Sequence, residues 1–199
     1  MSGADQDTLD YYSKQSEAYA DMTAGEADSP SMSRFVQMLP KGGRVLDFGS
    51  GPGWAAARFR DLGFEARAMD GSAGLAEEGR KRYGLEIEVC GFDALSAHAE
   101  FEGIWASFSL LHDTRQAMSE HLGRLHDALV PGGALYIGLK EGEGQKRDAL
   151  NRRYTYFTLP EMERLLDAAS FHIAHHDRDK AMGMDGVEAS CIHIFAHRD

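Results

Sequence analysis

Three glycines alternate with other residues directly after an apolar run, and a carboxylate stands just before them. Gly49, Gly51 and Gly53 follow residues 45–48, a run that contains Asp47. Glycines at a turn from strand to helix adopt backbone angles that other residues avoid, and they let a ligand approach the main chain without meeting a Cβ atom. The spacing therefore predicts a binding site for a nucleotide-like ligand at this turn.

The residues around this turn argue against a dinucleotide. The dinucleotide pattern G-x-G-x-x-G would need its third small residue at position 54, where this chain has Trp54. The carboxylate of Asp47 would also repel a pyrophosphate at the N-terminus of the following helix. A nicotinamide-dependent oxidoreductase is therefore the less favoured alternative, and a ligand with a cationic group suits the site better.

Two more carboxylates follow the next strand-like runs. Asp70 lies about twenty residues beyond the glycines, where α/β nucleotide sites use a carboxylate to accept from two ribose hydroxyls. Asp93 lies in a polar turn after residues 85–90. A helix N-cap is the structural alternative for Asp70, and a self-contained turn is the alternative for Asp93. Asp47, inside a strand end, needs hydrogen-bond partners, which we expect among the backbone amides of the glycine loop or on the ligand.

Alternating strands and helices are needed to position these residues. Strand-like apolar runs occupy residues 44–49, 65–70, 85–90, 101–111, 134–140, 170–176 and 188–195. Helical patterns occupy residues 11–22, 32–39, 52–62, 72–82, 114–129 and 158–169. This order predicts an α/β fold with a Rossmann-like, doubly wound, seven-stranded sheet that is mostly parallel, ends in an antiparallel C-terminal hairpin strand and carries helices on both faces. Such sheets bind ligands at the carboxyl ends of their strands.

Composition narrows the class of protein further. The 199 residues show no linker or repeat, which favours a single domain over residues 1–199. A formal net charge of −11 and scattered Lys and Arg residues disfavour nucleic acid as a partner. We expect no targeting segment and no membrane partner, and Cys90 and Cys191 lie in apolar runs typical of buried thiols. These features predict a cytoplasmic protein and say nothing about its oligomeric state.

The segment from Asp47 to Gly53 resembles the D-x-G-x-G-x-G motif of the class I S-adenosylmethionine-dependent methyltransferases. Other features follow in that family's order, namely Asp70, the stretch Gly91-Phe92-Asp93-Ala94, and the stretch Leu129-Val130-Pro131-Gly132-Gly133 before a later strand. The chain is most similar to small bacterial members described as tellurite-resistance-like or methyltransferase-domain proteins, from about residue 44 onward. Residues 11–20 resemble the lid helix that covers the cofactor in many of these proteins.

The resemblance implies one methyltransferase domain, with residues 1–40 as N-terminal lid helices and residues 41–199 as the core, and S-adenosylmethionine as the cofactor. In this family an acidic residue at the position of Asp70 holds the ribose hydroxyls, and one at the position of Asp93 meets the adenine amino group. The implied cofactor-binding residues are Tyr12, Tyr19, Asp47, Gly49, Ser50, Gly51, Gly53, Asp70, Gly71, Ser72, Phe92, Asp93, Ala94 and Ser107.

Methyl transfer from a sulfonium depends mainly on holding the acceptor atom near the methyl group in a dry pocket. Aromatic rings can face the cation, and Tyr12, Tyr19, Trp54 and Phe108 are candidates, although core packing is favoured for the last two. His112 is the candidate catalytic residue, as a general base for a protonated acceptor. A hydrogen bond that orients the following loop is the alternative.

Lys140, Arg153 and Tyr154 form the candidate substrate site. They follow a strand that ends on the ligand side of the sheet, and their chemistry would suit a small anionic substrate. A solvated charged loop is the alternative. The C-terminal histidines alternate between strand faces without a ligand spacing, so we expect no metal. The leading hypothesis is a methyltransferase acting on a small molecule, and a non-enzymatic cofactor-binding or regulatory protein is the alternative that the glycine loop leaves open.

Overall fold

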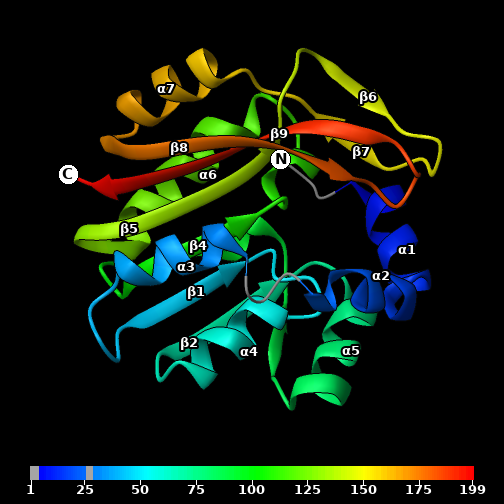
Figure 1. Ribbon diagram of the computed structural model, residues 1–199, viewed down its shortest axis with the longest axis horizontal. Helices are drawn as coiled ribbons and strands as arrows, with labels where there is room; N and C mark the ends of the chain where they lie inside the picture. The colour runs from blue at the N-terminus through cyan, green and yellow to red at the C-terminus, as the bar shows by residue number, and fades with distance from the viewer. Residues whose placement is uncertain (1–4, 26–28) are drawn as a thin grey trace.

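In residues 5–25 and 29–199, which the computed structural model describes, seven strands form one sheet (Figure 1). They are β1 (Arg44–Phe48), β2 (Glu65–Asp70), β3 (Ile87–Val89), β4 (Phe101–Ser107), β5 (Leu129–Lys140), β8 (Phe171–Met182) and β9 (Glu188–Arg198). Their order in space is β3-β2-β1-β4-β5-β9-β8. The first five run parallel, and β9 is antiparallel to both of its neighbours. The predicted mostly parallel sheet with an antiparallel C-terminal strand is confirmed.

Helices lie on both faces of this sheet, as predicted. They are α1 (Gln6–Lys14), α2 (Ser16–Thr23), α3 (Pro30–Gln37), α4 (Trp54–Asp61), α5 (Ala73–Tyr83), α6 (Ala117–Ala128) and α7 (Leu159–Ala168). Side chains of α6 and α7 join the larger apolar core on one face, and those of α3 and α4 join a second core on the other face. The side chains of β1 alternate between the two, because Leu46 and Phe48 belong to the first core and Val45 to the second.

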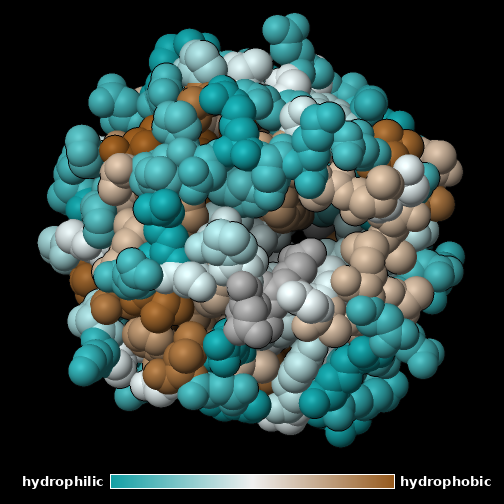
Figure 2. Space-filling view, in the orientation of Figure 1, coloured by the Kyte–Doolittle hydropathy of each residue, from teal (hydrophilic) through white to brown (hydrophobic). Residues whose placement is uncertain are grey.

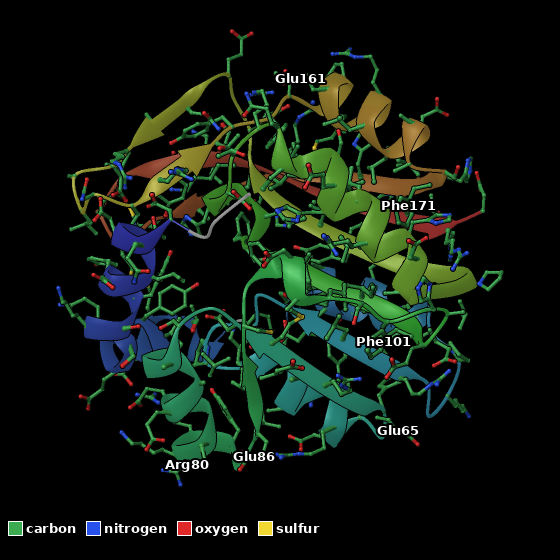
Figure 3. All side chains as sticks on the ribbon, turned by 180° about the vertical axis from the view of Figure 1, so that it is seen from behind. Glu65, Arg80, Glu86, Phe101, Glu161 and Phe171 are labelled. Carbon is green, nitrogen blue, oxygen red and sulfur yellow. The ribbon has the colours of Figure 1, made fainter. Side chains whose placement is uncertain are left out.

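The carboxyl ends of the parallel strands point toward α1 and α2. Figure 3 shows from behind that Glu65, Phe101 and Phe171, the first residues of β2, β4 and β8, lie at the end of the sheet away from α1. Two 3-10 turns, η2 (Phe92–Ala94) and η3 (Leu110–His112), follow the carboxyl ends of β3 and β4. The fold therefore gathers the loops that follow β1 to β4 on the side that α1 and α2 cover.

The single helix predicted over residues 11–22 is wrong. Two helices, α1 and α2, meet at Gln15, whose φ of −110° and ψ of 22° leave the helical range. Helix α1 also begins earlier than predicted, because the side chain of Asp5 caps it by accepting a hydrogen bond from the Thr8 N–H at 3.1 Å. Because of this break, two short helices cover the end of the sheet, where one continuous helix was predicted.

Two further segments differ from the prediction. The stretch after β5, expected as a loop, contains a separate antiparallel ribbon of β6 (Gln145–Arg147) and β7 (Arg153–Thr155). Strands β8 and β9 extend beyond the predicted runs, and the turn between them approaches α1, where Tyr11 Oη lies 3.9 Å from Met184 Sδ. Figure 1 shows this turn and the ribbon on the same side of the molecule as α1.

Residues 1–4 and 26–28 belong to the predicted lid region 1–40 and lie outside the described residues, so a single domain over residues 1–199 stays a prediction. Within the described ranges, none of the helices has the length and apolar composition that crossing a bilayer requires. The same ranges contain no group of three His, Cys, Asp or Glu side chains placed to hold a metal ion.

Candidate active site

Two cavities lie at the carboxyl ends of the strands, beneath α1 and α2, and share part of their walls. The β2-side cavity is lined by Asp5, Thr8, Leu9, Asp70, Gly71, Leu75, Cys90, Gly91, Phe92, Ser109 and Asp113. The hairpin-side cavity is lined by Met22, Thr23, Asp47, Ser50, Pro52, Trp54, Ala55, Trp105, Leu111, Lys140, Arg152, Tyr154, Ala181, Met182, Gly183, Met184 and Cys191. Seven residues border both cavities and are called the junction here: Tyr12, Tyr19, Gly49, Gly51, Ser107, Phe108 and His112.

The three glycines after β1 divide into two kinds. Gly49 and Gly51 belong to the junction, and a Cβ atom on Gly49 would lie 2.3 Å from Ser109 Cβ. Gly53 lines neither cavity among the described residues, and its Cβ would instead meet Leu85 Cδ1 at 2.9 Å. The role of Gly53 in cofactor binding stays a prediction. All three glycines have a positive φ, and a Cβ atom at Gly49 or Gly53 would meet protein atoms, but only Gly49 and Gly51 border the cavities.

Asp70 lies at the end of β2 and borders the β2-side cavity, as predicted from its position. Its Oδ2 accepts a hydrogen bond from the Gly51 N–H at 2.8 Å, and its Oδ1 accepts one from the Ser72 N–H at 2.7 Å. Each carboxylate oxygen keeps a second lone pair for a hydroxyl donor. Burial raises the pKa of the Asp70 carboxyl to about 6. The side chain thus fixes the glycine loop and can also accept from a diol.

Ser72 and Gly71 take different positions. Gly71 lines the β2-side cavity, where a Cβ atom would lie 2.8 Å from Leu9 Cδ2 of α1. Ser72 is buried outside both linings; it caps α5 by accepting from the Leu75 N–H at 3.3 Å, and its Oγ lies 2.8 Å from Ser13 Oγ. In this arrangement Ser72 positions α5 and α1, and its cofactor role stays a prediction.

The loop after β3 is shifted by about one residue from the predicted contacts. Phe92 lines the β2-side cavity, together with Cys90 and Gly91, which were not predicted. Asp93 and Ala94 are exposed and line neither cavity. The cause is the 3-10 turn η2, which anchors the Phe92 ring against Phe48, with ring centroids 4.8 Å apart, and turns the next two residues outward.

Asp47 points toward α4, because it alternates with Leu46 and Phe48 along β1. The side chain is 2% exposed, and its Oδ2 accepts a hydrogen bond from the Ala56 N–H at 3.1 Å. Burial, with a smaller contribution from the charge of Asp70, raises the pKa of the Asp47 carboxyl to about 8. The expected partners in the glycine loop are thus replaced by the first turn of α4, and a neutral acid stands at the wall of the hairpin-side cavity beside Ser50.

His112, Tyr12 and Ser107 all belong to the junction, and their roles toward cofactor and acceptor stay predictions. Tyr12 Oη lies 2.9 Å from His112 Nε2, and His112 Nδ1 lies 2.7 Å from the carbonyl oxygen of Arg153. Burial lowers the pKa of His112 to about 4 and raises that of Tyr12. Both side chains are therefore neutral near pH 7.

Aromatic rings surround the same point. Tyr19 packs edge-on against Tyr12, with ring centroids 4.9 Å apart. Phe108 has a φ of +51°, a conformation that side chains with a Cβ rarely adopt, and this backbone turns the chain at the end of β4. Trp54, for which core packing was favoured, belongs to the second core and also lines the hairpin-side cavity. The core packing expected for Trp54 is confirmed, and its contact with the cation stays a prediction.

Of the predicted substrate residues, Lys140 and Tyr154 line the hairpin-side cavity and Arg153 does not. Lys140 Nζ lies 3.9 Å from the centre of the Tyr154 ring. The Arg153 guanidinium instead pairs with Asp5 at 3.0 Å. The neighbouring Arg152 takes the predicted place, because successive side chains along an extended segment point to opposite sides.

Arg152 is 1% exposed and connects several elements. Its Nη2 lies 2.6 Å from Asp148 Oδ2, its Nε donates to the same oxygen at 2.9 Å, and its Nη1 donates to Tyr12 Oη at 3.1 Å. One buried guanidinium thus joins the turn of the β6–β7 ribbon to helix α1.

The hairpin turn and α2 form one wall of the hairpin-side cavity. Ala181 and Met182 at the end of β8 and Gly183 and Met184 of the turn line it, and none of them was predicted. Met22 and Met182 are 46% and 63% exposed, and Figure 2 shows a recess on this face with hydrophobic residues along its right border. No sequence motif marks these residues. They reach the cavity because β8 and β9 are longer than predicted, and that length was the signal that could have identified them.

The residues of the two cavities fit the implied cofactor. The β2-side cavity offers a carboxylate beside a glycine-lined loop, an aromatic ring at Phe92 and, at the junction, the bare main chain of Gly49 and Gly51. These features suit a ribose, a purine and an extended amino acid chain, respectively. Among the described residues, no cation pairs with the Asp70 side chain, which accepts hydrogen bonds from backbone N–H groups. This again suits a positively charged nucleoside better than a pyrophosphate.

Comparisons with known proteins agree with this fit. Residues 45–133 match a family described as "Methyltransferase domain". Malonyl-[acyl-carrier protein] O-methyltransferase of Enterobacter lignolyticus is 32% identical over 94 residues, which are 46% of this chain and 37% of the relative. The chain therefore matches little more than a third of that relative's length.

Solved structures match over more of the chain. The 1,6-didemethyltoxoflavin-N1-methyltransferase of Burkholderia thailandensis, with bound 1,6-didemethyltoxoflavin and S-adenosylhomocysteine, is 25% identical with a TM-score of 0.76, covering 98% of this chain and 88% of that one. A methyltransferase of Methanosarcina mazei shares the fold at 17% identity and a TM-score of 0.74, covering 85% of this chain and 97% of that one. The matched domain and the solved structures support a class I methyltransferase fold for this chain, which is similar to S-adenosylmethionine-dependent methyltransferases.

Proposed function

We propose that this protein transfers the methyl group of S-adenosylmethionine to a small-molecule acceptor held in the hairpin-side cavity. The single observation that carries the proposal is the junction, because seven residues wall both the cavity that fits the cofactor's nucleoside and a second cavity beside it. If the methyl group and the acceptor atom are held on the two sides of this shared wall, methyl transfer needs only their positioning and the exclusion of water.

Each part of the chain has a distinct task in this proposal. Asp70 accepts from the ribose hydroxyls, Phe92 packs against the base, and Gly49 and Gly51 admit the amino acid part. S-adenosylmethionine, when bound, supplies a methyl group on a sulfonium that is already a good leaving group. Tyr12 and Tyr19 reach over the junction from α1 and α2, so these helices shield the reacting atoms from water.

A small molecule is the acceptor that the walls favour. The second cavity is closed by α2, the β6–β7 ribbon and the turn of the β8–β9 hairpin, which leave room for a compact ligand rather than a polymer. The net charge of −11 also opposes a nucleic acid. The Burkholderia relative with a bound small acceptor and S-adenosylhomocysteine supports the same assignment. A cytoplasmic location remains a prediction from the sequence.

The first experiment measures S-adenosylhomocysteine binding by calorimetry in the wild type and in two matched aspartate variants. Asp70→Ala should weaken binding by about 100-fold, because it removes an ionised acceptor for two hydroxyls, each worth about 1.5 kcal/mol. Asp93→Ala should bind as the wild type does, since its side chain is exposed outside both cavities. Equal losses in both variants, or no binding to the wild type, would contradict the cofactor site.

The second experiment tests turnover. Purified protein is incubated with S-adenosylmethionine and pooled small-molecule acceptors, and S-adenosylhomocysteine formation is followed by mass spectrometry. Product from at least one pool is expected. Tight cofactor binding without product from any pool would favour the non-enzymatic binding protein instead.

A further inference from the structure

The hydrogen bonds of His112 fix which of its nitrogens carries the proton. A carbonyl oxygen can only accept, so the 2.7 Å contact with Arg153 O places the hydrogen on His112 Nδ1. The lone pair of Nε2 then accepts the hydroxyl hydrogen of Tyr12 across 2.9 Å. Both nitrogens of this imidazole are therefore in use, and the assignment follows from the partners.

The hydroxyl of Tyr12 is also engaged in hydrogen bonds with its neighbours. Its hydrogen points to His112, and its oxygen accepts from Arg152 Nη1 at 3.1 Å. A phenol has one hydrogen, so Tyr12 has none left to donate to a ligand. Neither His112 nor Tyr12 can take a proton from an acceptor without breaking this buried network.

The hairpin-side cavity nevertheless presents positive charge. Arg152 is neutralised by Asp148, at 2.6 Å. Lys140, at the end of β5, forms no ion pair with any of the described carboxylates, and its ammonium group lies against the Tyr154 ring instead. A half-buried cation of this kind favours an anion in the space beside it.

The groups that act on Lys140 come from several elements. Asp185 of the hairpin turn and Asp148 of the ribbon turn favour its charge, and Arg152 opposes it. Cys191, its register partner on β9, has a pKa that burial raises to about 11, so this thiol is neutral. Burial and the charge of Arg152 lower the pKa of Lys140. The attraction from Asp185 and Asp148 acts without direct contact and leaves the ammonium group open to a ligand.

We propose that the acceptor enters the hairpin-side cavity as a small organic anion, a carboxylate or an acidic phenol, with Lys140 as its counter-ion. The inference rests on the proposed function. A lone pair of the anion forms the new bond to the methyl carbon, and the carbon–sulfur bond breaks with its electron pair left on sulfur. One negative and one positive charge vanish, and no proton is released at the junction. His112 and Tyr12 are thus positioning residues that hold α1, η3 and the ribbon together, and no general base is required.

The test uses 4-nitrophenol, whose coloured anion is distinguished from the neutral phenol by absorbance. The probe is titrated with pH in the presence of excess protein and S-adenosylhomocysteine. A site that prefers the anion should lower the probe's apparent pKa by about half a unit or more, a threefold preference. Lys140→Met should abolish the shift. Lys146→Met is the matched control, because Lys146 is exposed on β6 and lines neither cavity.

One further variant separates a counter-ion from a base. His112→Asn should keep the downward shift, whereas a histidine that accepts the phenol's proton would lose it on substitution. An unshifted or upward-shifted titration in the wild type, or a shift that survives in Lys140→Met, would overturn the proposal. Calorimetry with S-adenosylhomocysteine on the same samples distinguishes the two proposals, because a failed cofactor site shows no binding, whereas a failed anion site leaves it intact.

Discussion

Two adjacent arginines should differ sharply in what their removal costs. Arg152 is buried and pairs with a buried carboxylate, Asp148, whereas the side chain of Arg153 is 27% exposed and pairs with Asp5. Replacing either with methionine keeps most of the apolar stem and removes the charge. The pair of variants therefore isolates the electrostatic part of each site on the same short segment.

The expected loss of stability in each variant follows from the contacts that the partner aspartate keeps. Without Arg152, Asp148 stays buried with only the N–H groups of Leu150 and of residue 152 itself, at 3.0 and 2.9 Å. Breaking a buried ion pair costs about 3–5 kcal/mol, and these two hydrogen bonds place the cost near about 3 kcal/mol. Without Arg153, Asp5 keeps Arg147 at 2.6 Å, so the loss should stay below about 1 kcal/mol.

The assay is urea unfolding followed by circular dichroism, with the free energy of unfolding compared at equal slopes. We expect Arg152→Met to lose about 2 kcal/mol more than Arg153→Met. If Arg152→Met does not fold, Arg152→Lys, which keeps a charge but loses the planar fork, measures the same difference on a smaller scale. Equal losses within about 0.5 kcal/mol, or a larger loss for the exposed position, would refute the assignment of the two arginines.

Two further predictions concern β1 and its loop. Because folding raises the pKa of Asp47 from about 3.9 to about 8, stability from its bound proton is complete below about pH 4 and is lost as the pH rises toward 8. Between pH 5 and pH 8 the free energy of unfolding, measured in urea, should therefore fall at least about 1 kcal/mol less in Asp47→Asn than in the wild type. Parallel pH profiles of the two proteins would contradict this. Gly49→Ala and Gly53→Ala should both lower the urea midpoint, because the new Cβ would meet protein atoms at 2.3 and 2.9 Å. Calorimetry should show that Gly49→Ala weakens S-adenosylhomocysteine binding at least about tenfold and that Gly53→Ala changes it less than about threefold. Similar affinities for both glycine variants would argue against the division of the loop.

The sheet could be predicted because its signals are local. The apolar runs, their turn residues and the helical patterns each lie within about a dozen residues, and burial on both faces forces parallel strands to read as continuous apolar runs. The same locality explains why Asp70, Gly49 and Gly51 could be expected beside a cavity, since each lies at or just after the end of a strand of the predicted order. The helix predicted over residues 11–22 failed because nothing in the sequence marks the break at Gln15.

Contacts that depend on rotation by one residue were predicted less well. Asp93 was predicted to line a cavity, but its neighbour Phe92 does so. Likewise Arg153 was predicted, but Arg152 lines the cavity. A shift of one residue along an irregular segment is enough to exchange the side chain that faces the cavity. No periodic pattern exists in such short loops from which the facing side could be read. Side-chain direction there is decided by distant partners, such as the pairing of Asp5 with Arg147 and Arg153.

The acceptor side of the site depends on contacts between segments far apart in the sequence. The hydroxyl of Tyr12 on helix α1 bonds both Arg152, beside the ribbon turn, and His112, in the chain after β4. Displacing α1 would break both bonds and remove one wall from each cavity. The two cavities are therefore coupled through one residue, and each is complete only when α1 is seated.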